Sequence, residues 1–259
     1  MLPIGSLVVF ISIWQLVGGR VDPLLFATPS SVVRALWHMI DSGVLGPAFV
    51  TSMEDLAVGY ALAVAVGIMV GLLVGRSQVV ERVLNPYINF FQATPLIALV
   101  PLVVIWFGIG FEARIVVVFM LAVWSILIST AAGVKQTPSS LKEVGRVYKY
   151  NWLQSITRIE LPNAVPSIFA GLRIALGKAL IGMVIAQMEI TTTGLGGLVV
   201  NYGNAFKTAY LLGAIFTASL VGVVAAVILE LIRKWIFPWT VSDESGARPP
   251  EIKPGRTLS

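Results

Sequence analysis

The chain has 259 residues, of which 57% are hydrophobic and 12% are charged, and its formal net charge is +5. Soluble domains contain about 25% charged residues, so half that share together with long uncharged runs indicates an integral membrane protein. The absence of cysteine excludes disulfides and thiolate chemistry, and the single histidine has no second histidine with which to share a metal ion.

The first expected element is an uncharged helix from Met1 to about Gly19. This segment has no basic N-terminal region and no small-residue cleavage site follows it, so we interpret it as a membrane crossing and not as a signal peptide. Farther on, Val32, Leu36 and Ile40 recur at helical spacing with polar residues on the other faces. That pattern predicts a short helix lying at the membrane surface.

The second crossing is predicted at Leu56–Gly75, where 20 consecutive residues carry no charge. About 20 residues are enough to cross the ~30 Å hydrocarbon core. Glycines recur there at multiples of four positions, namely Gly59, Gly67, Gly71 and Gly75. They form a ridge on one face of the predicted helix, where another helix can approach closely.

The third crossing is expected in Val83–Gly110, an uncharged run of 28 residues. Three prolines interrupt it, namely Pro86, Pro95 and Pro101. The length and the prolines predict a kinked or tilted crossing. Gln92 and Thr94 lie inside this run, where polar groups need partners or water. Both are therefore candidates for lining a transport pathway, with a hydrogen bond to a neighbouring helix as the alternative for Gln92.

The fourth crossing is predicted at Ile115–Val134, after a tight external turn at Phe111–Arg114. Trp124 lies near the middle of this crossing, so it faces either the pathway or another helix.

The fifth crossing is expected to begin near Pro166 and to end at Glu189, and it carries charge within the membrane. Ionisable residues at this depth usually face a bundle interior or a water-filled cavity. Lys178, Gln187 and Glu189 are therefore candidate pathway residues. Lys178 would either favour an anion or pair with Glu189 or Glu230.

The sixth crossing is predicted at Thr208–Leu229, which is uncharged for 22 residues. Residues 240–259 are polar and include three prolines, so we expect a disordered cytoplasmic tail behind a membrane domain of residues 1–239. Between the last two crossings, the glycine-rich segment Thr191–Gly197 is expected to be an external or re-entrant loop.

The distribution of cations orients the chain, because six crossings put both of its ends on one side. Twelve lysines and arginines then lie on that side, and Arg173 and Lys178 fall within the membrane. The remaining four lie on the other side, namely Arg20, Arg34, Arg114 and Lys207. The positive-inside rule places the side with twelve in the cytoplasm. Membrane orientation therefore accounts for the net charge without a nucleic-acid partner.

A polar island, Glu143–Pro162, separates the fourth and fifth crossings. It must lie on the membrane surface, where a soluble partner can reach it. Ser140 with Glu143 fits a capping box, and Asn151 with Gln154 repeats the pattern, so two short helices are predicted. The alternative is a plain surface loop with well-capped helices.

This island resembles the EAA motif of the permease subunits of bacterial ABC importers. The residues that carry the resemblance are Glu143, Gly145, Arg158 and the pair Leu161-Pro162. Lys149 stands where the motif usually has a glycine, which would suit a left-handed helix C-cap. A lysine in that conformation costs roughly 1 kcal/mol, so we expect a turn of different shape here.

The resemblance implies an all-α integral membrane protein with six transmembrane helices and a cytoplasmic coupling helix, the architecture of type I ABC importer permeases. It implies a second permease copy, two cytoplasmic ATPase subunits and an extracytoplasmic binding protein as partners in a bacterial inner membrane. The chain itself would be no enzyme and would bind no cofactor, because ATP and magnesium belong to the ATPase. The coupling region, residues 138–162, would dock on that ATPase through Leu141, Glu143, Val144, Gly145, Val147, Tyr148, Lys149, Leu161 and Pro162.

Further matches resemble one subfamily of these permeases, which moves nitrate, sulfonates, taurine and pyrimidine or flavin precursors. They include the segments 94–96, 171–173 and 194–196, which read Thr-Pro-Leu, Gly-Leu-Arg and Gly-Leu-Gly. Many relatives have a glutamate where this chain has Gln187, and Glu189 lies two residues farther on. Whether Glu189 takes the place of that glutamate is left open by the sequence.

Two other functional classes fit the sequence less well. An ion-coupled secondary transporter would need charged groups deep in several crossings, and usually an inverted repeat. A membrane enzyme would need a catalytic cluster. Only the fifth crossing carries deep charges, and neither a repeat nor paired carboxylates within one crossing are evident.

Overall fold

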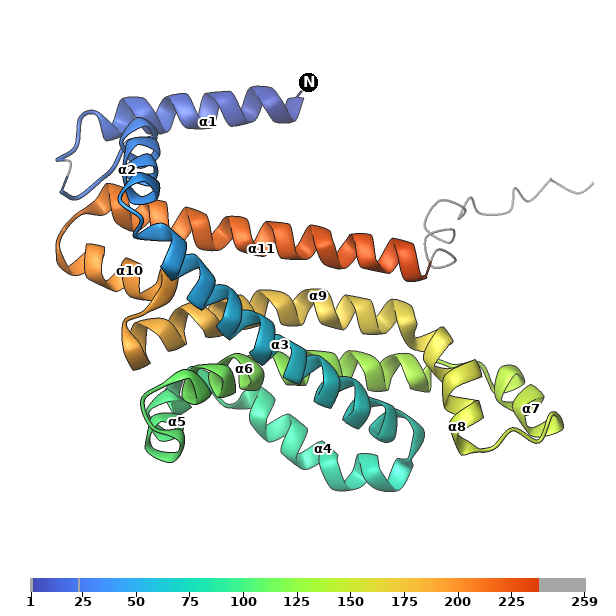
Figure 1. Ribbon diagram of the computed structural model, residues 1–259. Coiled ribbons are helices and arrows are strands. Elements are labelled where there is room, and N and C mark those ends of the chain that lie inside the picture. The colour runs from blue at the N-terminus through green and yellow to red at the C-terminus, as the bar shows by residue number, and fades with distance from the viewer. Residues whose placement is uncertain (1, 23, 238–259) are drawn as a thin grey trace, which may run out of the picture.

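The computed structural model describes residues 2–22 and 24–237 (Figure 1). Over these residues the regular structure consists of eleven α-helices, one 3-10 turn and two π-helical turns, so the all-α fold class is confirmed. The whole of the predicted tail, residues 240–259, lies outside the described residues.

Four helical segments of the described chain are long and apolar enough to cross a membrane. They are α3 (Leu45–Arg76), α6 (Phe111–Lys135), the run Trp152–Thr191 that includes α9 (Leu161–Ala186), and α11 (Thr208–Ile236). Helix α1 (Leu2–Gly18) is apolar but has only 17 residues. A fifth candidate consists of two helices joined at a sharp bend.

That bent pair lies where the sequence predicts a kinked third crossing. Helix α4 (Gln78–Ala93) stops at Thr94, and the chain resumes after a bend of 92° in the 3-10 turn η1 (Leu96–Leu99) and α5 (Val100–Phe107). The ring of Pro95 disfavours a helical conformation for the residue before it, and Thr94 is extended with ψ 132°. The predicted kink is therefore a break between two helices.

A glycine ridge holds α3 against α6, as the sequence predicts. A Cβ atom added at Gly67 would lie 2.8 Å from the Cβ of Ile126, and one at Gly71 would lie 2.6 Å from the Cβ of Thr130. Gly59 and Gly75 meet Val118 and Val134 in the same way. Since such distances leave no room for a side chain, the backbones of α3 and α6 approach as closely as glycine allows.

Helix α6 also packs along α9, so α6 lies between α3 and α9 in the core. Gly133 on α6 lies against Ser167, and Gly171 on α9 lies against Ser129. A Cβ atom added at either glycine would clash with the serine side chain. The expected external turn at Phe111–Arg114 is wrong, because these residues form the first turn of α6.

The short helix predicted around residues 32–40 is confirmed as α2 (Pro29–Asp41), whose N-cap is the side chain of Thr28; its position at the membrane surface stays a prediction. Val32, Ala35 and Met39 are buried on one side of it, and this helix packs against α11. The segment expected to be a loop at Thr191–Gly197 is only partly so, because α10 (Gly194–Asn204) already begins at Gly194.

Successive long helices run in alternating directions (Figure 1). The short helices α7 (Ser139–Val147) and α8 (Trp152–Ser155) therefore lie at the end of the bundle where α3, α6 and α11 finish. Helix α10 and the bend after α4 lie at the opposite end (Figure 1).

Candidate functional site

The polar island folds into an elbow of two short helices, α7 and α8, as predicted. Asn151 caps α8 with the predicted box: its Oδ1 accepts from the Gln154 amide at 2.8 Å, and Gln154 Oε1 accepts from the Asn151 amide at 3.0 Å. The box predicted for Ser140 and Glu143 is wrong. The N-cap of α7 is Pro138, two residues before Ser140, and it makes no side-chain cap.

The turn that closes α7 keeps the left-handed geometry despite the lysine. Lys149 has φ 51°, its amide donates to the carbonyl of Arg146, and the amide of Tyr150 donates to the carbonyl of Gly145 at 2.9 Å. This pair of bonds is a Schellman motif with lysine in the glycine position. The expectation of a differently shaped turn is therefore wrong, because the two backbone bonds offset the strain of the lysine.

The elbow carries apolar side chains that the rest of the described chain leaves at least 42% exposed. Val147 is 79% exposed and Tyr148 is 70% exposed. We call the exposed set the elbow patch; it comprises Leu141, Val144, Val147, Tyr148, Trp152 and Leu153. Glu143 and Lys149 are exposed beside the patch, whereas Gly145 is buried against Ile159. Contiguous exposed apolar side chains with a polar rim mark a protein or membrane contact.

The elbow is joined to the bundle without a helix boundary at Leu161-Pro162. Helix α8, the π-helical turn η2 (Ile156–Glu160) and α9 form one helical run, so the expected closure of the island at Leu161 and a fifth crossing starting near Pro166 are wrong. Proline lacks the amide hydrogen that would bond four residues back, and its ring crowds that carbonyl. The wider π-helical turn directly before Pro162 accommodates both effects.

An ion pair fixes this run to the end of α3. Arg76 donates through Nη1 to Glu160 Oε1 at 2.8 Å, and its guanidinium lies 5.6 Å from the ring centre of Trp152. The Glu160 side chain is 6% exposed, and its second oxygen has no partner among the described residues.

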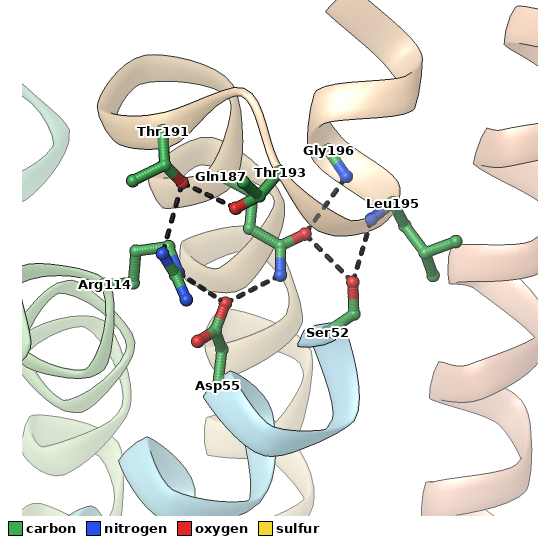
Figure 2. Close-up of polar contacts among 8 residues, drawn as sticks. All are labelled: Ser52, Asp55, Arg114, Gln187, Thr191, Thr193, Leu195 and Gly196. Carbon is green, nitrogen blue, oxygen red and sulfur yellow. Dashed lines mark hydrogen bonds and ion pairs between the residues drawn. The ribbon is translucent and has the colours of Figure 1, made fainter. Parts of the chain in front are cut away.

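A second polar site lies at the opposite end of the bundle and centres on Asp55 (Figure 2). Arg114 Nε donates to Asp55 Oδ2 at 2.8 Å, and Gln187 Nε2 donates to the same oxygen at 2.8 Å. Asp55 and Gln187 are fully buried, and Arg114 is 8% exposed. A buried carboxylate is stable only when an opposite charge and hydrogen bonds compensate it. Here Arg114 supplies the charge and one hydrogen bond, and Gln187 supplies a second hydrogen bond.

The same network holds the start of α10. Gln187 Oε1 accepts from the Ser52 hydroxyl at 3.0 Å and from the Gly196 amide at 3.1 Å, while Ser52 Oγ accepts from the Leu195 amide at 2.9 Å (Figure 2). The first amides of a helix have no intrahelical partners, so these two bonds act as its cap. The polar network therefore joins α3, α6, α10 and the π-helical turn η3 (Gln187–Thr191).

The candidate pathway residues do not form one cluster. Gln92 and Thr94 lie at the end of α4, where the neighbouring Phe91 stacks on Trp124 at 4.8 Å. Lys178 and Glu189 are exposed, and no described residue forms an ion pair with either, so the alternative pairing of Lys178 is not found. Gln187 is buried, whereas Glu189, two residues farther on, is exposed.

Sequence reasoning missed Ser52, Asp55 and Arg114 as members of a site. Asp55 and Arg114 each come directly before an uncharged run, and that position is typical of a charged residue that flanks a membrane crossing. An acidic and a basic residue that both lie at the N-terminal ends of neighbouring crossings indicate that an ion pair can form between the two helices. Their separation of 59 positions leaves the pairing to the tertiary structure.

Comparison with known proteins identifies the family. The model of the family "Binding-protein-dependent transport system inner membrane component" matches residues 63–242. The nitrate import permease protein NrtB of Synechococcus elongatus is 31% identical over 83% of this chain and 81% of its own length. The bicarbonate transport system permease protein CmpB of the same organism is 30% identical over 92% and 88%. The taurine transport system permease protein TauC of Escherichia coli is 28% identical over 92% and 89%.

Two solved structures share the fold. A MetNI methionine ABC transporter chain in an inward-facing conformation has a TM-score of 0.56 at 19% identity, over 70% of this chain and 93% of its own. A chain of an amino acid ABC transporter has a TM-score of 0.57 at 14% identity, over 76% and 94%. This chain therefore belongs to the binding-protein-dependent inner-membrane permeases, the non-catalytic transmembrane components of ABC importers.

Proposed function

We propose that two copies of this chain form the pathway of an importer, and that each copy crosses the membrane six times with both ends in the cytoplasm. Helix α1 and the bent α4–α5 pair supply the two crossings beyond the four long helices. The alternating directions of the helices support this count (Figure 1). They place the start of α1 and the end of α11 toward the end of the bundle that carries the elbow.

The charges support the cytoplasmic position of the elbow. Most described cations lie at that end, among them Arg76, Arg82, Lys135, Lys142, Arg146, Lys149, Arg158, Arg233 and Lys234. The other end carries Arg20, Arg34, Arg114 and Lys207. Short loops rich in lysine and arginine remain on the cytoplasmic side.

The elbow patch is the observation that carries the proposal. Six apolar or aromatic side chains are exposed on two short helices that stand away from the bundle (Figure 1). A soluble ATPase subunit on each permease copy would cover this patch, with α7 as the coupling helix. Glu143 and Lys149 would provide charged contacts at its rim.

The substrate class follows from α9. Arg173 and Lys178 are exposed on this helix, within a segment that is long and apolar enough to cross the membrane. A cation facing lipid at such depth is costly, so these side chains would face water in the pathway. They favour a small anion, in agreement with the nitrate and bicarbonate named for two relatives.

Single cysteines test the orientation and the docking, because the chain has no cysteine of its own. Val147→Cys should react with a membrane-impermeant maleimide only in inside-out vesicles, and the ATPase subunit should protect it. Ile109→Cys, which is 75% exposed at the other end, should react only from outside. Labelling of Val147→Cys from outside, or labelling unaffected by the ATPase, would contradict the proposal.

Transport is tested in proteoliposomes that contain the permease, the ATPase and the binding protein. We expect ATP-dependent uptake of one labelled anion, nitrate or bicarbonate. Lys178→Gln should lower that uptake, and Lys207→Gln should not, because Lys207 lies outside the long helices.

A further inference from the structure

Helix α9 has a π-helical turn at each of its two ends. The turn η2 contains Glu160 and the turn η3 contains Gln187. Each turn directs one buried side chain onto α3: Glu160 meets Arg76, and Gln187 meets Asp55. π-Helical turns in α-helices occur frequently at functional sites, so their pairing with the same neighbouring helix calls for an explanation.

The two contacts are separated by about the thickness of a membrane. Asp55 and Arg76 are 21 residues apart on α3, which corresponds to roughly 32 Å at 1.5 Å per residue. That length matches the ~30 Å thickness of the hydrocarbon core. Between them, the hydroxyl of Tyr60 donates to the carbonyl of Leu172 at 2.8 Å, which adds a third bond between α3 and α9.

The cytoplasmic contact adjoins the elbow directly. Glu160 ends the π-helical turn that follows α8, and Arg76 touches both Glu160 and the ring of Trp152 in α8. A movement of the elbow therefore reaches the end of α3 through a bonded contact. The glycine ridge keeps α3 in close register with α6, so α3 cannot slide along α6 to absorb the movement.

The external contact ends at the turn that leads into α10. Asp55 holds Gln187 and Arg114, and Gln187 in turn accepts from the Gly196 amide. A displacement of α3 relative to α9 at this end would leave the buried carboxylate of Asp55 without its hydrogen-bond donor Gln187. That loss is costly, so the two helices move together there.

We infer that α3 is a strut that joins the elbow to the external end of the permease, with Arg76–Glu160 and Asp55–Gln187 as its two fastenings. These four are positioning residues: they carry the state of the ATPase to the side where the binding protein docks. The inference rests on the proposed docking of the ATPase at the elbow. It assigns to α3 the transmission of movement between the two ends of the permease, which the coupling region at one end cannot perform alone.

The experiment uses the complete complex in nanodiscs and measures the ATPase rate with and without loaded binding protein. Arg76→Met breaks the cytoplasmic fastening and also removes the guanidinium beside Trp152 of the elbow patch, a ring on which the methionine thioether can still pack. Lys135→Met is the matched control, because it also removes a helix-end cation from an ion pair, with Glu81 on α4 at 2.5 Å, but does not touch α9. Assembly by size-exclusion chromatography and Tm are measured for every variant.

We expect Arg76→Met to lower the stimulation by binding protein at least about fivefold at unchanged assembly, in the range of ordinary coupling energies. Lys135→Met should remain within about twofold of the natural complex. The exchange Arg76→Glu with Glu160→Arg should restore stimulation. Normal stimulation in Arg76→Met, or a loss equal to that of Lys135→Met, would overturn the inference.

A double variant separates a strut from general damage to the fold. Because the two fastenings act in series, Arg76→Met combined with Asp55→Asn should lower stimulation no further than the stronger single change. Losses that multiply would show independent effects and would overturn the inference. If the natural complex itself shows no stimulation by any binding protein, the proposed function fails, and this outcome is recognised before any variant is made.

Discussion

Gln187 Nε2 donates a hydrogen bond to Asp55 Oδ2 at 2.8 Å across 132 positions of sequence. The same carboxylate oxygen already accepts from Arg114. An amide suits this place because its nitrogen donates to the carboxylate, while its oxygen accepts from Ser52 and from the start of α10. A second carboxylate would supply only acceptors.

Exchanging the two groups tests this arrangement. Gln187→Glu should destabilise the permease by about 1–3 kcal/mol, because Asp55 loses a donor and gains a neighbouring charge. Adding Asp55→Asn should recover most of that loss, since the amide and the carboxylate then change places while Arg114 keeps one anionic partner. Thermal unfolding of the solubilised permease measures both steps. Equal stability of Gln187→Glu and the natural chain would show that the hydrogen bond contributes nothing.

Removing the buried carboxylate should have a larger effect. Asp55→Ala leaves Arg114 buried without its counter-charge, which typically costs about 3–5 kcal/mol. Glu54→Ala is the matched control, because Glu54 is the adjacent acidic residue and is exposed. Unfolding measured side by side should show a large loss for the first variant and less than about 1 kcal/mol for the second. Similar losses would mean that the position on α3, and not the ion pair, determines the effect.

The parts of the fold that follow from local chemistry could be predicted. Glycines at multiples of four positions define one face of a helix wherever that helix packs, so the ridge on α3 was foreseeable from Gly67 and Gly71. The cap at Asn151 depends on a residue three positions away, and it too was correct.

The parts that depend on distant residues could not be predicted. Arg114 and Gln187 reach Asp55 only after three helices have packed, and no local pattern encodes that meeting. Lys149 shows the converse limit: its left-handed conformation is unfavourable for a lysine, but the backbone bonds to Arg146 and Gly145 form all the same. The pair Leu161-Pro162 predicts a helix boundary, but the helical run continues through it, because the π-helical turn Ile156–Glu160 comes directly before this pair.

The glycine ridge makes a prediction about packing. Gly71→Ala would bring a Cβ atom to 2.7 Å from the carbonyl oxygen of Leu127, which is backbone and cannot rotate away. We expect a loss of about 1–3 kcal/mol from overpacking. Gly177→Ala, in the interior of α9, meets nothing within 4 Å and should stabilise the helix by up to about 1 kcal/mol. Chemical denaturation in mixed micelles compares the two. A stabilising Gly71→Ala would mean that α3 and α6 do not pack in this register.

The turn after α7 makes a prediction about strain. Lys149→Gly should raise the stability of the elbow by about 1 kcal/mol, because glycine adopts positive φ without steric cost. Lys142→Gly, in the interior of α7, should lower it by a similar amount. Hydrogen exchange of the amides of Lys149 and Tyr150 reports the local effect directly. Faster exchange in Lys149→Gly would show that the lysine side chain, and not the backbone, holds the turn.

The contact between α7 and η2 determines whether a movement of the coupling helix is transmitted to the bundle. A Cβ atom at Gly145 would lie 2.7 Å from the Cδ1 atom of Ile159, the flexible end of that side chain, so Gly145→Ala should be accommodated by a small shift. The branched side chain of Gly145→Val cannot be, and it should push α7 away from η2, reduce transport and leave Tm within a few degrees. Truncating the neighbour in Gly145→Val with Ile159→Ala reopens the space and should restore uptake. Uptake by Gly145→Val at the natural rate, or no recovery in the double variant despite normal assembly, would show that this contact does not set the position of the coupling helix.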